Sequence, residues 1–295
     1  MKKSLNEEIR EIQESKSTKT AKAQALFKLG LRKHEVVLLL SQAPDATASI
    51  RTAYTFGVEI ECLVPRAEIE TIATRNNMPF RYEGYNHVDN NSYYKFVSDS
   101  SIVGENSIEC VSPVLKGGRD GFASLKNACK SLTEAHARVN RSCGLHVHIG
   151  ADKLTGKQYA NVFVNYAFLE MAIDSFMAQS RRENNSQWCR TMVGYIDALQ
   201  ECETHNDVCR AMNNNRYFKV NAVSYSRHKT IEFRQHQGST DFTKIKNWVN
   251  FCAKLVAWSK KNVLTAPITN IEDIPFLTEK EKMYFTSRRV LFNDL

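Results

Sequence analysis

Hydrophobic and polar positions alternate along several short stretches from residue 54 onward, and a period of two predicts β-strands. We expect strands at residues 54–64, 92–98, 106–112, 143–149, 217–225 and 230–236. Apolar positions spaced three and four residues apart predict helices at residues 66–76, 119–138, 155–180, 187–201, 241–261 and 278–289. The last two strands are joined by residues 226–229, a connection of hairpin length. This order predicts an α+β fold with a bent, largely antiparallel sheet that carries helices on one side.

The N-terminal segment has a different pattern, with helical spacing that ends in the apolar run Val36 to Leu40. An Ala-Pro-Asp sequence at residues 43–45 closes this segment, because proline interrupts a helix. None of the chemistry-bearing residues described below falls within it. We therefore expect an N-terminal helical appendage at residues 1–50 and one larger domain at residues 51–295.

Composition narrows the class of protein. Of the 295 residues, 42% are hydrophobic, which is enough for a large buried core. No run of about eighteen apolar residues occurs, and the charged start lacks the apolar stretch of a signal peptide. We therefore expect a cytoplasmic protein with no membrane partner. The eight cysteines are scattered and form no CxxC pair, which favours buried, reduced thiols over a cysteine zinc site.

The formal net charge of +8 fits either a nucleic-acid partner or a site for anionic small molecules. The basic residues are dispersed along the chain, and no arginine-rich tract or RNP-like aromatic strand accompanies them. This distribution favours a phosphate-bearing small substrate over nucleic acid.

The first predicted strand carries two carboxylates on one face. The period of two places Gly57, Glu59 and Glu61 on one side, and the residues between them are apolar. The two carboxylates then stand about 7 Å apart. Neighbouring acids repel each other unless a cation lies between them, so this face is either solvated or holds a cation.

Two later strands repeat this geometry. His146 and His148 share a face of the strand at 143–149, an arrangement that points two imidazoles into one site. Glu232, Arg234 and His236 share a face of the last strand, and the residues between them face the core. The polar faces of these strands are thus rich in side chains that bind metals or phosphates.

A further predicted strand contributes Glu109, and it follows Asp99 in the chain. If these faces line one concave sheet, the set of metal ligands is Glu59, Glu61, Asp99, Glu109, His146 and Glu232. Oxygen-rich ligands suit magnesium or manganese, and so many acids imply two or more ions. Two divalent ions beside arginines describe a phosphoryl-transfer site, although no Walker A or kinase signature occurs.

The combination and order of these motifs resemble the amidoligase family over roughly residues 54–260. The resemblance rests on Phe56-Gly57-Val58-Glu59-Ile60-Glu61, Asp99-Ser100-Ser101, Glu109-Cys110-Val111-Ser112-Pro113, Cys143-Gly144-Leu145-His146-Val147-His148 and Thr230-Ile231-Glu232-Phe233-Arg234. It implies the fold of glutamine synthetase and glutamate-cysteine ligase, an antiparallel sheet bent into a funnel that ATP enters at one end. It also implies an ATP-dependent ligase, in which an amine displaces phosphate from an acyl phosphate.

The resemblance also implies roles for individual residues. Glu61, Asp99 and Glu109 are expected to bind the ion nearest the carboxylate substrate, although Asp99 stands where relatives have glutamate. The ion at the ATP phosphates is expected to be held by Glu59, His146 and Glu232. Arg234 is expected to contact the transferring phosphoryl group, which makes Arg234, Glu232 and Glu61 the expected catalytic residues. His148, Arg181 and Arg182 are expected near the nucleotide, but the arginine pair also fits a helix C-terminus that it stabilises through the helix dipole.

Two other functions fit the same residues. A metal-dependent hydrolase could use His146 and His148 as metal ligands. Hydrolases of this kind usually carry such a histidine pair on an early strand of a parallel barrel. A non-catalytic module of the same fold would bind nucleotide and metal without turnover. The substrates are not specified by the sequence: the amine donor could be an amino acid, a polyamine, a cell-wall peptide or a protein side chain. The oligomeric state is not specified either.

Overall fold

The computed structural model describes residues 3–17, 19–31, 36, 39, 54–84, 86 and 88–292. Its strands are β1 (Thr55–Leu63), β2 (Phe80–Tyr82), β3 (Tyr94–Val97), β4 (Ser107–Val111), β5 (Leu115–Lys116), β6 (Gly144–Gly150), β7 (Val220–Asn221) and β8 (Thr230–Gln237). Its α-helices are α1 (Leu5–Glu14), α2 (Lys19–Lys28), α4 (Arg66–Arg75), α5 (Arg119–Glu134), α6 (Gly156–Asp174), α7 (Ile196–Gln200), α8 (His205–Ala211), α9 (Ser224–His228), α10 (Phe242–Ser259) and α11 (Glu279–Phe292). Three 3-10 helices are η1 (Gln179–Arg181), η2 (Val193–Tyr195) and η3 (Ile271–Asp273).

The strands form one eight-stranded sheet in the order β2-β3-β4-β1-β6-β8-β7, and β5 pairs with the start of β1. Every pairing is antiparallel except that of β2 with β3. The predicted mixed fold with a largely antiparallel sheet is thus confirmed. Strand β1 lies at the centre, between β4 and β6, so its side chains occupy the middle of both faces.

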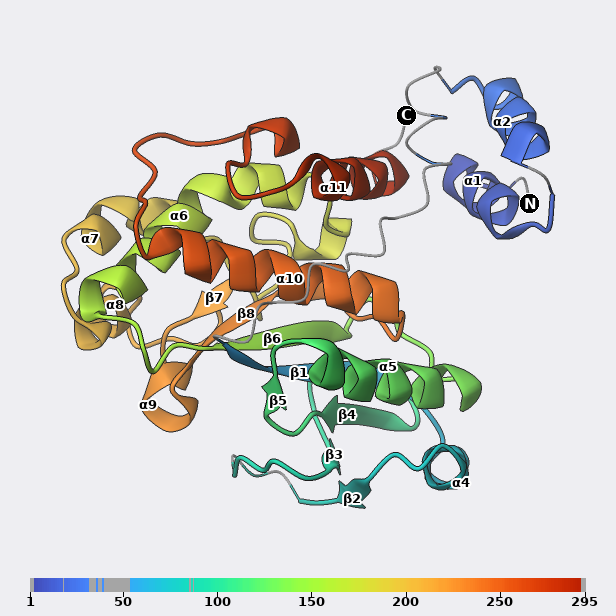
Figure 1. Cartoon of the computed structure of the whole chain (residues 1–295), viewed down its shortest axis with the longest axis horizontal. Coiled ribbons are helices and arrows are strands. Elements are labelled where there is room, and N and C mark those ends of the chain that lie inside the picture. The colour runs from blue at the N-terminus through green and yellow to red at the C-terminus, as the bar shows by residue number, and fades with distance from the viewer. Residues whose placement is uncertain are drawn as a thin grey trace.

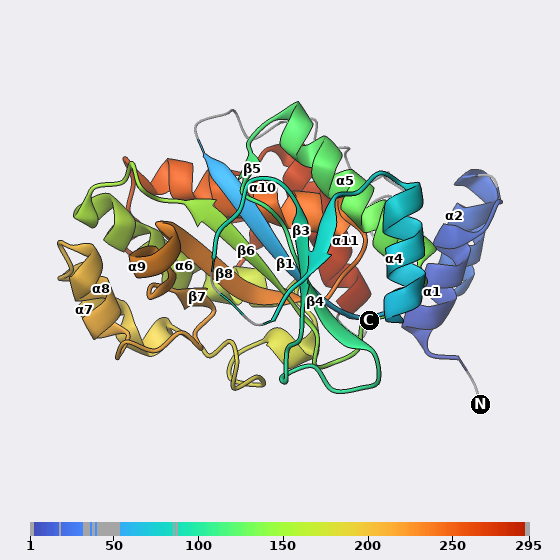
Figure 2. The same ribbon diagram turned by 90° about the horizontal axis from the view of Figure 1, so that it is seen from below.

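Helices α5, α6 and α10 cover one face of this sheet, and the view from below shows the strands in front of α5 and α10 (Figures 1 and 2). Val58 and Ile60 of β1 and Phe233 of β8 are fully buried in the core between the sheet and these helices. Helix α6 begins at a capping box of Thr155 and Gln158, which satisfies backbone N–H groups at its first turn. The polar residues that alternate with the core residues face the other side.

The chain between β7 and β8 differs from the predicted hairpin. Strand β7 is only two residues long, because Asn221 Oδ1 accepts a hydrogen bond from the Val223 backbone N–H at 2.8 Å and turns the chain. The short helix α9 follows, and Lys229 takes a left-handed conformation with φ 54° before β8. Residues 223–225, predicted as strand, are therefore part of a turn and a helix.

Other differences concern short elements. The helix predicted at 187–201 is limited to α7 and the preceding η2, because Arg190 instead forms a parallel bridge with Phe218. Helix α6 ends at Asp174 rather than near residue 180. Strands β2 and β5, with three and two residues, are too short to show a period of two, and α8 was not predicted.

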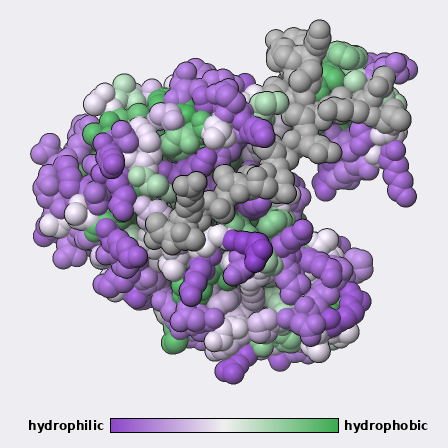
Figure 3. Space-filling model, viewed as in Figure 1, coloured by the Kyte–Doolittle hydropathy of each residue, from purple (hydrophilic) through white to green (hydrophobic). Residues whose placement is uncertain are grey.

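Helices α1 and α2 pack beside α11, and they form a lobe of their own next to the sheet domain (Figures 1 and 3). Ile9, Leu26 and Val290 belong to a small apolar cluster separate from the main core. The predicted boundary near residue 50 lies outside the described residues. Hydrophilic residues cover most of the face visible in Figure 3. Within the described part of the chain, we find no helix with the length and apolarity that a membrane span requires.

Candidate active site

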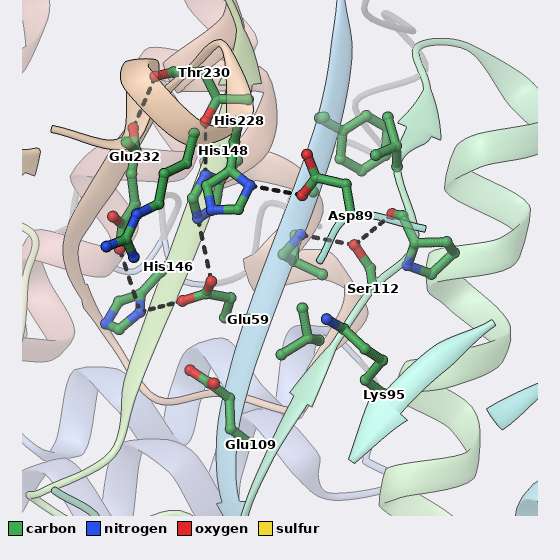
Figure 4. A pocket seen from close by; sticks show the side chains of 18 of the residues that line it. Glu59, Asp89, Lys95, Glu109, Ser112, His146, His148, His228, Thr230 and Glu232 are labelled. Atoms are coloured by element: carbon green, nitrogen blue, oxygen red, sulfur yellow. Dashed lines mark hydrogen bonds and ion pairs between the residues drawn. The ribbon is translucent and has the colours of Figure 1, made fainter. Parts of the chain in front are cut away.

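Four adjacent strands bring the predicted residues together on the sheet face that the helices leave open. Glu61 of β1 is paired with Glu109 of β4, and Glu59 is paired with His146 of β6. His148 is paired with Glu232 of β8. Because side chains on paired positions point to the same face, these residues form one continuous surface. Figure 4 shows its part around Glu59, His146 and Glu232 at close range.

Glu59 lies between the two imidazoles. Its Oε2 atom is 2.8 Å from His146 Nδ1, and its Oε1 atom is 3.3 Å from His148 Nε2 (Figure 4). The other ring nitrogen of His148 is 2.9 Å from Thr230 Oγ1. The carboxylate and the hydroxyl together fix the orientation of both rings.

Glu232 and Arg234 form a buried ion pair on β8, with exposures of 3% and 4%. Asn221 Nδ2 donates to the second Glu232 oxygen at 2.6 Å, and Arg234 Nε donates to the Trp188 carbonyl at 3.3 Å. Both charged groups are thus held in place before any ligand binds. A preorganised guanidinium of this kind is suited to anionic oxygens.

Three overlapping groups of side chains have ligand atoms within 4.8 Å of one another. They are Glu61, Asp99 and Glu109; Glu59, Glu109 and His146; and Glu59, His148 and Glu232. The first matches the expected ligands of one ion. In the last group His148 accompanies Glu59 and Glu232, whereas the sequence placed His146 there. Carboxylate oxygens with one imidazole are ligands that fit magnesium or manganese.

The charges of this face perturb one another. Burial, followed by the charges of Glu59, Glu61 and Asp99, raises the pKa of the Glu109 carboxyl well above its usual value. Burial also acts to raise the pKa of Glu232, but the charges of Arg234, His148 and His146 together outweigh it and the pKa falls to about 2. Around Glu109, the negative charge of the acidic side chains thus exceeds the positive charge that the protein itself supplies. Such an excess of negative charge is typical of a cation-binding site.

Comparison with protein families identifies the family of the chain. A profile of the family described as "putative amidoligase enzyme" matches residues 52–256, which contain every strand of the sheet. The chain belongs to this amidoligase family. No curated protein matches the chain.

His236, which was expected on the same strand face as Glu232 and Arg234, points to the other side of the sheet of this amidoligase. A β-bulge places Arg234 and Gln235 opposite the single residue His146, so alternation shifts by one position beyond it. His236 consequently pairs with Leu145 and packs its ring 5.7 Å from the ring of Trp248 on α10. Burial in this apolar surrounding lowers the pKa of His236 to about 3. The expectation that His236 shares a face with Glu232 and Arg234 is wrong.

The structure separates the two arginines that follow α6. The Arg181 guanidinium is 3% exposed and lies against Gly144, where an added Cβ would be 3.3 Å from both of its terminal nitrogens and 3.0 Å from His146 Nε2. Arg182 instead donates to the Met177 carbonyl at 2.9 Å and to the Phe292 carbonyl of α11 at 3.2 Å. Arg181 thus lies beside the site, and Arg182, also predicted at the nucleotide, is directed toward α11.

A pocket of about 250 Å³ opens above the acidic face. Its wall includes Asn86 and residues 88–90, from which Asp89 reaches across to His228 of α9 with a separation of 2.7 Å (Figure 4). Lys95 also lines the pocket, although it was not among the residues predicted for the site. Lys95 lies on the strand predicted at 92–98, and Asp99 directly follows this strand. Because side chains alternate between the two faces, the spacing of four residues puts both on one face, which could have identified Lys95 from the sequence.

Proposed function

We propose that this amidoligase is an ATP-dependent carboxylate-amine ligase with a glutamine synthetase-like catalytic domain. The observation that carries the proposal is the set of three overlapping ligand groups on one open sheet face, beside the buried Arg234. Glu59 and Glu109 each belong to two groups, so each could be a ligand of two neighbouring ions. Two or more magnesium or manganese ions would fit these groups, because such ions prefer oxygen ligands and phosphoryl-transfer sites commonly hold a pair of them.

In the proposed reaction, a substrate carboxylate attacks the γ-phosphorus of ATP, and ADP leaves. An amine then attacks the acyl carbon, the C–N bond forms and inorganic phosphate departs. Bound divalent ions supply electrostatic stabilisation of the phosphate oxygens when present. Glu61, Asp99 and Glu109 would hold the ion nearest the substrate carboxylate. Glu59, Glu232 and one or both of the site histidines would hold the ion at the ATP phosphates.

The chain's own cations complete the phosphate end. Arg234 is oriented by Glu232 and by the Trp188 carbonyl, so its remaining N–H groups are available to the transferring phosphoryl group. Arg181 lies on the other side of His146, near Gly144. A cytoplasmic location is part of the proposal, because ATP is the expected co-substrate.

An ADP-release screen over panels of carboxylic acids and amines tests this function. We expect ADP release that requires magnesium or manganese, an acid and an amine together, and a product with a new amide bond by mass spectrometry. Nucleotide binding without ADP release for any pair would support a non-catalytic module instead. Hydrolysis of amides with tightly bound zinc would support a hydrolase that uses His146 and His148.

A further inference from the structure

Lys95 is a buried cation whose partners are neutral. Its side chain lines the pocket and is 5% exposed. Its ammonium donates to Asn86 Oδ1 at 2.9 Å and to the Val88 carbonyl at 2.8 Å, and no carboxylate among the described residues forms an ion pair with it. The Glu83 carboxylate, which accepts from Asn86 Nδ2 at 2.7 Å, interacts with this charge without contacting it. An ammonium has three hydrogens, and a buried charge without a counter-charge in contact is costly. Lys95 therefore has both a donor and a charge to offer to an anion in the pocket.

The sheet register places Lys95 in line with the acidic groups. Lys95 of β3 is paired with Val111 of β4, which is paired with Glu59 of β1, which in turn is paired with His146. Two strand spacings separate the Lys95 and Glu59 backbones, roughly 10 Å across the sheet. Figure 4 shows Lys95 and Glu109 extending from neighbouring strands toward the same hollow.

The surface between Lys95 and the acids is apolar. Val111 lies between Lys95 and Glu59 across the sheet, and Val97 lies between Lys95 and Asp99 along the chain. Both valines line the pocket. A ligand that crosses this floor gains apolar contacts in the middle and charged contacts at its ends.

From these positions we infer that Lys95 anchors a second oxyanion of the acid substrate, whose reacting carboxylate lies at the metal-binding acids. The aliphatic part rests on Val97 and Val111. The substrate class is thus a dicarboxylic acid or an amino acid with two carboxylates. This inference rests on the proposed function, because it takes a carboxylic acid to be one of the substrates. A nucleotide phosphate offers the same oxyanion chemistry, so the experiment separates the two sources.

Calorimetric titration compares glutarate with the monocarboxylate butyrate, in magnesium, on the wild-type chain and on Lys95→Met. We expect the wild type to prefer glutarate, and Lys95→Met to weaken glutarate binding roughly 10- to 100-fold while leaving butyrate unchanged, because one charge-assisted hydrogen bond is lost. Lys95→Arg retains the charge and is expected to recover part of the preference. Lys116→Met, which removes an exposed lysine on β5, is the matched control.

A second titration with magnesium and the non-hydrolysable analogue AMP-PNP separates the sources. If AMP-PNP binding weakens in Lys95→Met and glutarate binding does not, the anchored group is a nucleotide phosphate and the dicarboxylate assignment is overturned. Equal affinities of wild type and Lys95→Met for both ligands, or no glutarate preference in the wild type, also overturn it. A lower Tm with unchanged binding would show that Lys95 only holds Asn86 and Val88 in place and would also overturn the assignment. Neither titration needs turnover, so a failed ADP-release screen does not affect them.

Discussion

Arg234→Lys separates a role of the guanidinium in phosphoryl transfer from a role in holding the sheet together. Arg234 is 4% exposed, pairs with Glu232 and donates through Nε to the Trp188 carbonyl. Lysine keeps the charge near Glu232 but lacks the planar fork that grips two oxygens at once. If the fork meets the phosphoryl group mainly during transfer, its loss raises the activation free energy by about 2–4 kcal/mol, or roughly 30- to 1000-fold in rate.

The effect on stability is expected to be much smaller. The charge at position 234 is retained, and Asn221 continues to donate to Glu232. We expect a loss of about 1 kcal/mol from the Trp188 contact, which lowers Tm by roughly 2–4 °C for a domain of this size. A purely structural role predicts the reverse, with a large fall in Tm and weaker metal binding but little change in rate.

The assay measures single-turnover rate, ATP affinity and Tm on one preparation of Arg234→Lys. We expect kcat and kcat/KM to fall together while the Kd for ATP changes little. Arg66→Lys is the matched control, because Arg66 forms an exposed ion pair with Glu70 on α4. An unchanged single-turnover rate in Arg234→Lys would refute the proposed role.

Three further predictions concern the metals and the strand that carries Arg234. Glu232→Gln is expected to abolish ADP release with a nearly unchanged circular dichroism spectrum, and loss of cooperative unfolding would indicate a structural role instead. Calorimetry is expected to show weak magnesium binding that ATP tightens, because phosphate oxygens complete the ligand set, whereas tight zinc binding indifferent to ATP would contradict this. Burial depresses the pKa of His236 to about 3, so the folded state binds fewer protons than the unfolded state below about pH 6.5 and loses stability as pH falls. This effect should make the wild type about 2 kcal/mol less stable at pH 5 than at pH 7, and His236→Phe is expected to remove this part of the pH dependence. Urea titrations at the two pH values that show the same difference in both proteins would refute this prediction.

Alternation along β1 was sufficient to predict which residues face the site. Glu59 and Glu61 lie on the open face and Val58 and Ile60 in the core, because a regular strand in a sheet covered on one side has no other low-energy arrangement. The same argument worked for His146 and His148 on β6. The mixed fold and most helices followed from similarly long periodic segments.

Where the backbone departs from regularity, the sequence was not sufficient. The extra residue in β8 reversed the direction of His236, and nothing in the pattern of apolar residues marks a bulge. The turn made by Asn221 shortened β7, since a single side-chain hydrogen bond outweighed strand propensity. The grouping of His148 with Glu232 depends on which strands are neighbours in the sheet, and alternation along a single strand does not reveal this.

The bulge in β8 also bears on how this chain can change in evolution. Arg234, one residue of the bulge, lines the pocket with Glu232, whereas Gln235, the other, accepts a hydrogen bond from the Tyr166 hydroxyl of α6. His236 follows and packs on α10. The number of residues in this segment therefore matters as much as their identity. Loss of one residue here would restore regular pairing with His236 still opposite Leu145, but it would remove either the arginine of the pocket or the glutamine that accepts from Tyr166. The length of this segment should therefore stay fixed among lineages of this protein.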